Sequence, residues 1–151
     1  MVAGEGMSIL ARPKRVIIES PYRSNDAHST EQHRKYLLHA IRDSIDRGEA
    51  PFASHLLIPE ILNDDDIYER SVGIRCGYAW GDCAEMVAVY QDFGLSHGMR
   101  LAVDRYQSLR LPIEWRRLPS ELVTSIKWIE VDWRRNIPQD SGRPGVRARE
   151  R

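Results

Sequence analysis

The sequence predicts an α/β protein whose small, open parallel sheet is flanked by helices in three α/β/α layers. Short apolar, β-branched runs alternate along the chain with segments of helical periodicity. Prolines, glycines and small polar residues separate these segments. This alternation favours β-α-β units, and therefore a mostly parallel sheet.

Length and composition fit one globular domain. The chain has 151 residues, of which 42% are apolar and 29% charged. Basic and acidic residues number 22 each, so we expect no nucleic-acid partner. No apolar run has the length of a membrane span, and no signal peptide is evident. We therefore expect no membrane association and a cytoplasmic location.

Both ends of the chain are expected to lie outside the domain. Residues 1–13 contain Gly4, Gly6 and Pro13 and show no clear period, which is typical of a flexible arm. Residues 136–151 combine prolines, glycines and arginines, which predicts a disordered basic tail. The α/β domain should then span residues 14–135.

The first predicted β-α unit comprises a strand over residues 16–18 and a helix from Ser29 to Gly48. Residues 16–18 are a β-branched run followed by Ser20-Pro21. Ser29 and Gln32 have the spacing of a capping box, and glycine commonly ends a helix. One helical face collects the apolar residues Leu37, Leu38, Ile41 and Ile45.

A second strand is predicted over residues 51–57, and a helix over residues 67–80 follows an acidic block at residues 64–66. The third unit has a strand over residues 86–90 and a helix over residues 98–109. A short closing strand is expected at residues 112–115. Residues 122–133 fit a helix or a strand equally well.

The cysteines and histidines do not predict a metal site. Cys76 and Cys83 lack CxxC spacing, and we expect both to be buried, reduced thiols. The five histidines show no HExxH pattern. We therefore expect no bound metal and no cofactor.

Three loops should carry the ligand contacts, because ligands of parallel sheets bind at the carboxyl ends of the strands. These loops span residues 20–26, 55–66 and 91–99. The expected ligand-binding residues are Ser20, Tyr22, Arg23, Asn25, His55, Ser96, Gly98 and Met99. The alternative is ordinary β-α turns, since neither GxGxxG nor GxxxxGK[ST] is present.

Individual residues in these loops suggest specific roles. Arg23 could bind an anion through two hydrogen bonds, and Gly98 would let a ligand approach the start of a helix. Asp64 and Asp65 could act as acid or base, although capping of the next helix explains them more simply.

Several segments together resemble the nucleoside 2-deoxyribosyltransferase-like superfamily, in a bacterial and phage branch of unknown function. They are residues 16–23, 51–57, 64–74, 96–100 (Ser-His-Gly-Met-Arg) and 112–116. The resemblance covers roughly residues 15–118. It implies a flavodoxin-like or Rossmann-like sheet, a nucleoside or nucleotide ligand, and a homo-oligomer.

Characterised enzymes of that superfamily cleave or transfer at the N-glycosidic bond, with a glutamate nucleophile a few residues into the helix after the third-strand loop. Counted from Gly98-Met99, this position is Ala102. The nearest acid is Asp104, which points about 200° away on a helix of about 100° per residue. Asp64, Asp65 and Asp104 are therefore the candidate catalytic carboxylates.

Three functions stay open at this point. The protein could act on the N-glycosidic bond of a nucleoside or nucleotide, with another carboxylate replacing the missing glutamate. It could instead bind a nucleotide derivative without turnover, as a sensor or sequestering protein. It could also be an interaction domain with a vestigial pocket.

Overall fold

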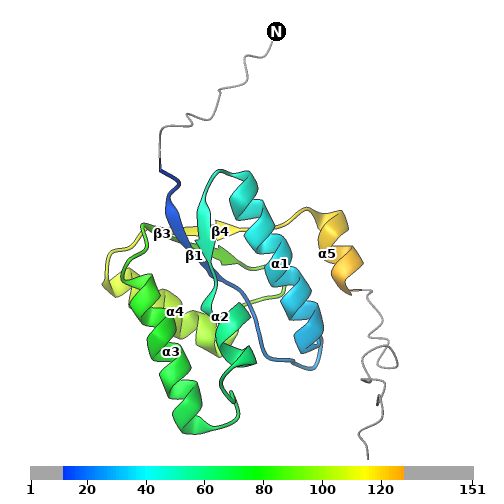
Figure 1. Ribbon diagram of the computed structural model, residues 1–151. Coiled ribbons are helices and arrows are strands. Elements are labelled where there is room, and N and C mark those ends of the chain that lie inside the picture. The colour runs from blue at the N-terminus through cyan, green and yellow to red at the C-terminus, as the bar shows by residue number, and fades with distance from the viewer. Residues whose placement is uncertain (1–11, 128–151) are drawn as a thin grey trace, which may run out of the picture.

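The computed structural model describes residues 12–127, which form the predicted three-layer α/β/α fold (Figure 1). The parallel sheet has the strand order β2-β1-β3-β4. Its strands are β1 (Arg15–Glu19), β2 (Ala50–Phe52), β3 (Met86–Tyr90) and β4 (Ile113–Arg116). Strand β2 pairs with one edge of β1, and β3 pairs with the opposite edge of β1. This reversal creates a topological switch point at the carboxyl ends of β1 and β3.

Helices cover both faces of the sheet. They are α1 (Thr30–Asp46), α2 (Ser54–Leu57), α3 (Ile67–Gly81), α4 (His97–Ser108) and α5 (Ser120–Lys127), with a 3₁₀ turn, η1, at Ile58–Glu60. Residues of α1 and α5 pack on one face, and residues of α4 pack on the other. Helix α3 lies beside α2 (Figure 1).

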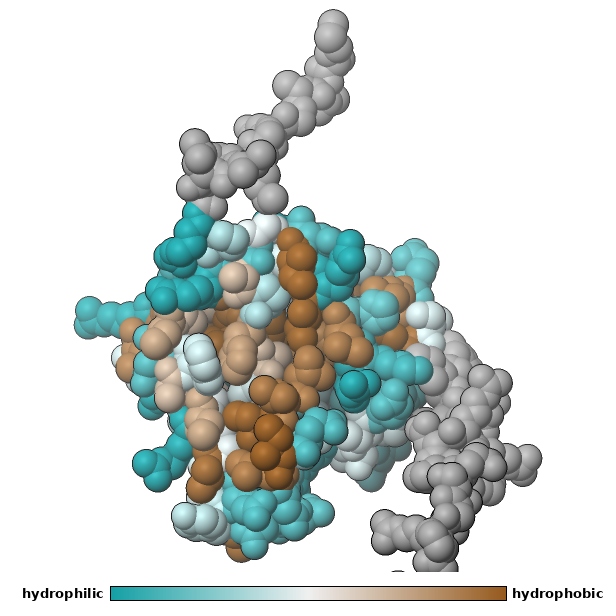
Figure 2. Space-filling view, in the orientation of Figure 1, coloured by the Kyte–Doolittle hydropathy of each residue, from teal (hydrophilic) through white to brown (hydrophobic). Residues whose placement is uncertain are grey.

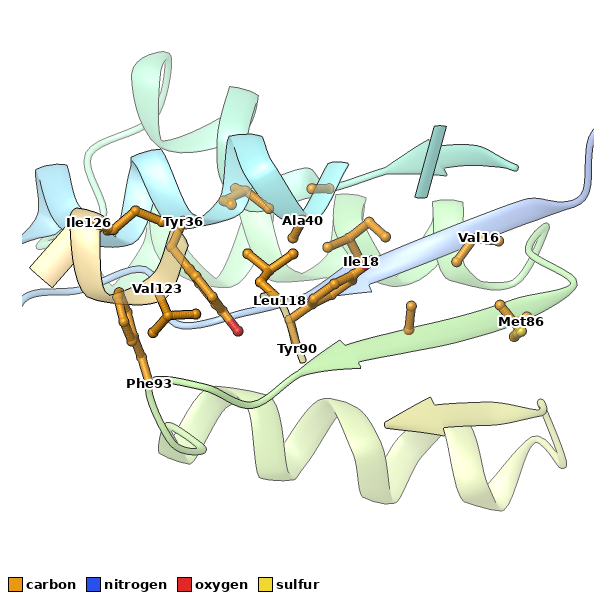
Figure 3. Packing of buried hydrophobic residues seen from close by; sticks show 13 residues of the cluster. Val16, Ile18, Tyr36, Ala40, Met86, Tyr90, Phe93, Leu118, Val123 and Ile126 are labelled. Atoms are coloured by element: carbon orange, nitrogen blue, oxygen red, sulfur yellow. The ribbon is translucent and has the colours of Figure 1, made fainter. Parts of the chain in front are cut away.

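Alternation along β3 divides its side chains between the two cores. Met86, Ala88 and Tyr90 pack towards α1 and α5, whereas Val87 and Val89 pack towards α4. All five residues are buried, as expected for a central strand of a parallel sheet. In the first core the rings of Tyr36 and Phe93 stack with centroids 4.5 Å apart (Figure 3).

The helix ends confirm most of the local sequence signals. Ser29 and Gln32 make both hydrogen bonds of the capping box, and Gly48 adopts a φ of 79° just after α1. Asp66 caps α3 by accepting a hydrogen bond from the Glu69 N–H, and Ser96 caps α4 in the same way. These contacts satisfy backbone donors that a helix leaves free at its start.

The strand predicted over residues 51–57 was wrong in its second half. Strand β2 ends at Phe52, and residues 54–57 form α2. The reason is that β2 lies at the sheet edge and pairs with β1 over only three residues, so the ladder stops there. A short apolar run does not distinguish strand from helix by periodicity.

The predicted burial of the cysteines was also wrong, since both thiols are free and exposed. Cys76 lies on α3, whose buried residues are Gly77 and Gly81. Of the ambiguous segment 122–133, residues up to Lys127 belong to helix α5. The rest of that segment, most of the expected arm and the expected tail lie outside the described residues. No helix within residues 12–127 is long and apolar enough to cross a membrane.

A buried ion pair joins the end of β4 to the segment before β2. The guanidinium of Arg116 is 2% exposed and donates two hydrogen bonds of 2.7 Å to the Glu49 carboxylate. Ser44 of α1 donates a third bond to Glu49, at 2.7 Å. Burial alone would raise the pKa of Glu49, but the bonds from Arg116 and Ser44 outweigh it and lower the pKa.

Replacing Glu49 by Gln should lower the free energy of unfolding by about 3 kcal/mol, because the buried Arg116 loses its main counter-charge. The effect should shrink as pH falls through the lowered pKa of Glu49, where the wild-type carboxylate also takes up a proton. Urea unfolding at several pH values measures both effects. Asp46→Asn, which breaks the exposed pair with Arg42, is the control and should cost less than about 1 kcal/mol. Equal losses in the two variants would contradict this account.

Candidate functional site

A cleft of about 730 Å³ opens at the carboxyl ends of β1 and β3, where the three predicted loops meet. Its size is typical of a small-molecule site. Nine of the residues expected from the sequence line it: Ser20, Tyr22, Arg23, Asn25, His55, Asp64, Ser96, Gly98 and Met99. Two others do not line it, since Asp65 points into solvent with a side chain 93% exposed and Asp104 is exposed on α4.

One side of the cleft carries two arginines held by a single aspartate. Asp64 accepts a hydrogen bond of 2.5 Å from Nε of Arg23 and one of 2.8 Å from Nη1 of Arg70. A further hydrogen bond joins the Arg23 guanidinium to the Asp64 carbonyl oxygen. Asp65 also lies 3.5 Å from Nη2 of Arg23, so two carboxylates face the two guanidinium groups. The arginine N–H groups at the edge of the cleft are suited to an anionic ligand. Arg70 was not among the predicted site residues, since a helical Glu-Arg pair usually lies on a surface.

The floor of the cleft contains a hydrogen-bonded serine–histidine pair. Oγ of Ser20 and Nε2 of His55 are 2.9 Å apart, and Ser20 is only 4% exposed. The ring of Tyr22 lies edge-on to that of His55, with centroids 6.5 Å apart. Burial lowers the pKa of His55 to about 4, so the imidazole is neutral at physiological pH. The pair can thus offer polar atoms to a ligand without adding charge.

Glu19 is the site residue that the sequence analysis missed. It ends β1, lines the cleft, and is paired in register with Val89. Burial of its carboxyl raises the pKa to about 8, and the hydroxyl of Tyr106 opposes the shift through a hydrogen bond. The sequence does contain a signal for this residue. Glu19 is a charged residue that directly follows the three β-branched residues of a buried strand.

Helix α4 presents the expected face to the cleft. Met99, Ala102 and Tyr106 line the cleft and are buried on the same side of the helix, whereas Asp104 lies on the exposed side. Ala102, the position predicted from the resemblance by counting from Gly98-Met99, therefore faces the cleft. The methyl group there can contribute packing but no acid, base or nucleophile.

Glycines of α3 allow close packing around the site. A Cβ atom added at Gly77 would lie 2.7 Å from Oγ of Ser54, and one at Gly81 would lie 2.7 Å from Cε1 of Tyr106. At Gly73 the same addition would approach Ile58 to 2.9 Å. The three glycines recur every four residues and so share one helix face. This face lets α3 approach α2, η1 and α4, which encloses the cleft.

Within residues 12–127, no three histidine, cysteine or acidic side chains come together as a metal-binding group. The polar groups in the cleft are instead arginines, hydroxyls, two imidazoles and carboxylates. Such a set suits an organic ligand that carries hydroxyl groups and an anion.

Comparison with known protein families assigns the chain. Residues 14–116 match the family described as a domain of unknown function, DUF7768. The protein belongs to this family. The matched region contains the whole sheet and every described segment that lines the cleft. No curated protein matches the chain.

Among solved structures, the fold is similar to that of a 2-deoxyribosyltransferase from the psychrotolerant bacterium Bacillus psychrosaccharolyticus. The TM-score is 0.53, and the alignment covers 74% of this chain and 80% of the other at 12% sequence identity. At this identity the likeness establishes a shared Rossmann-like fold, as the sequence resemblance implied.

The protonated state of Glu19 predicts a distinct pH dependence of stability. The unfolded carboxyl loses its proton near pH 4.3, whereas the folded one keeps it up to a pKa of about 8. The contribution of Glu19 to stability should therefore fall as pH rises through this interval. Glu19→Gln does not titrate, so the variant should gain about 2 kcal/mol or more over wild type between pH 5 and pH 8. Urea unfolding across this range measures the difference, and a constant difference would contradict the burial of a neutral carboxyl.

Proposed function

We propose that the cleft binds a nucleoside or nucleotide, with its phosphate or sugar hydroxyls towards Arg23 and Arg70. The observation that carries the proposal is the division of the cleft into a side with two arginines, the basic side, and a floor of uncharged polar groups. The two arginines and Asp64 form the basic side, while the floor holds Ser20, His55 and Tyr106. The position at the switch point of a parallel sheet supports the same assignment.

The apolar part of the lining suits the base of such a ligand. Ile58 of η1, Leu62 of the segment after it and Met99 of α4 all line the cleft. Flat aromatic bases gain free energy when such surfaces exclude water from their faces. The likeness to a deoxyribosyltransferase fold adds support from an enzyme that acts on nucleosides by its description.

Ala102 favours a second candidate, a binder without turnover. An alanine on the cleft-facing side of α4 removes the side chain expected to attack the sugar. A sensor or sequestering protein would need the basic side and the floor but no nucleophile. The two candidates share one ligand and differ in whether free base appears.

A panel of nucleosides, deoxynucleoside monophosphates, triphosphates and nucleotide sugars should contain a compound that raises the melting temperature. A ligand at a hundred times its Kd stabilises the folded state by about 2.7 kcal/mol. Differential scanning fluorimetry detects binding, and chromatography of the same mixtures detects released base. Absence of a shift with every compound would contradict the proposal.

Arg23→Ala and Arg70→Ala should each weaken binding of a monophosphate about tenfold, because a charge-assisted hydrogen bond is worth about 1.5–3 kcal/mol. Binding of the matching unphosphorylated nucleoside should change little. Isothermal titration calorimetry compares the two ligands, and Arg42→Ala, exposed on α1, is the charge-matched control. Unchanged monophosphate affinity in both variants would show that the phosphate does not bind at this side.

We further propose that a second copy of the chain covers the apolar surface beside the cleft. Figure 2 shows hydrophobic side chains gathered over α2 and α3. Leu57, Ile61, Ile67 and Tyr68 are each more than half exposed there. Burying them against another copy would remove apolar area from water.

Sedimentation velocity should show a dimer or larger species, and Ile67→Lys should weaken this association. A monomer at all concentrations would contradict the proposal.

A further inference from the structure

The carboxyl of Glu19 lies on the same face of the sheet as the position of the missing glutamate. Side chains alternate along β1, so Glu19 shares a face with Ile17, which packs in the core formed with α4. That core also contains Ala102 and Tyr106. Glu19, Ala102 and Tyr106 all line the cleft. A carboxyl is thus present in the same cleft and on the same sheet face as the alanine, but a strand provides it instead of a helix.

Packing holds the partner of this carboxyl in place. Tyr106 is 2% exposed, and its hydroxyl interacts with Glu19. The ring fits against α3 because Gly81 has no side chain, since a Cβ there would come within 2.9 Å of the hydroxyl oxygen. The glycine therefore leaves room for the tyrosine hydroxyl next to Glu19.

The three carboxylates that line the cleft differ in their partners. Asp64 is paired with two arginines, and Glu69 accepts a hydrogen bond from the Asn63 backbone N–H. Glu19 has no ion pair with any residue of the described chain, 12–127. Partly buried at the end of β1 and without a cation, its carboxyl has a pKa raised to about 8 and keeps a proton at neutral pH. A protonated carboxyl can donate a proton but cannot act as a nucleophile.

We propose that Glu19 is a catalytic residue, the general acid that protonates the departing base when the cleft hydrolyses the N-glycosidic bond of a nucleoside or nucleotide. The inference rests on the function proposed above. It assigns hydrolysis to the site and gives the carboxyl a role that does not require the missing glutamate.

The proposed step needs only water as co-reactant. The bond between the anomeric carbon and the base nitrogen breaks, and its electron pair goes to the base. The Glu19 carboxyl gives its proton to the base, and a water oxygen forms the new bond to the anomeric carbon. The proton lost by this water returns to the Glu19 carboxylate. The products are the free base and the sugar with an anomeric hydroxyl, and Glu19 ends in its starting form.

The pH dependence of base release should follow the protonation of Glu19, since few other groups act on this carboxyl. Tyr106 of α4 interacts with Glu19 directly, Tyr78 of α3 acts on Tyr106, and His55 of α2 lines the same cleft. The remaining charged or titratable residues of the lining are Tyr22, Arg23, Asp64, Glu69, Arg70, His97 and Arg100. His55 titrates near pH 4, far below the value of about 8 for Glu19.

The test measures binding and base release separately, with the nucleosides and deoxynucleoside monophosphates of the panel as probes. Glu19→Gln should bind with unchanged affinity and release base at least a hundredfold more slowly, since general acids contribute about 10²–10⁴-fold. Glu19→Asp, which keeps an acid, should recover part of the rate. Wild-type kcat should be level below the pKa of Glu19 and decline above it. Glu121→Gln, an exposed change on α5, is the control and should keep full activity.

Each other outcome identifies what has failed. Binding by the wild type without base release would overturn the inference and leave the proposed binding function standing. Base release that Glu19→Gln does not slow would assign the acid to another group and also overturn it. No binding of any probe would overturn the proposed function and, with it, this inference. Circular dichroism of Glu19→Gln establishes that the variant is folded before its rate is interpreted.

Discussion

Burial of β1 and β3 on both faces is the constraint on which the rest of this structure depends. Every residue of β3 is buried, and Val16 to Ile18 of β1 are buried with them. Parallel strands buried in this way need helices on both sides, and each β-α connection then emerges at the same edge of the sheet. Polar residues that cannot enter the core collect at this edge, which explains why one cleft gathers three loops.

Glu19 is the exception to that separation of apolar core from polar edge. It continues a buried strand with a carboxyl group, in a place where α4 supplies Ala102 and the Tyr106 hydroxyl. Burial of an unpaired carboxyl costs stability, and such residues concentrate at functional sites. The arginine pair on Asp64 lies on another side of the same cleft. The cleft thus holds an arginine pair and a carboxyl of raised pKa in two separate environments.

The chain belongs to the DUF7768 family and shares a Rossmann-like fold, but neither fact determines the chemistry of the cleft. One fold can support several activities because loops and helix ends change while the sheet stays. In this chain α4 begins with His97, Gly98 and Met99, and the residue that faces the cleft one turn into the helix is Ala102. What the site can do therefore depends on the groups that line it.

Local signals in the sequence determined the strands at residues 16–18 and 86–90, the capping box at Ser29, the acid cap before α3 and the three loops of the cleft. These features depend on neighbours within about four residues, so the sequence alone contains the information. The early end of β2 and the exposure of Cys76 depend on which strand lies at the edge and which helix face meets solvent. Likewise, Glu19 interacts with Tyr106, and Gly81 leaves space for the tyrosine ring. These three residues belong to elements that are distant in sequence. Only the tertiary structure decided them, because burial and contact across the chain exist only once the layers are packed.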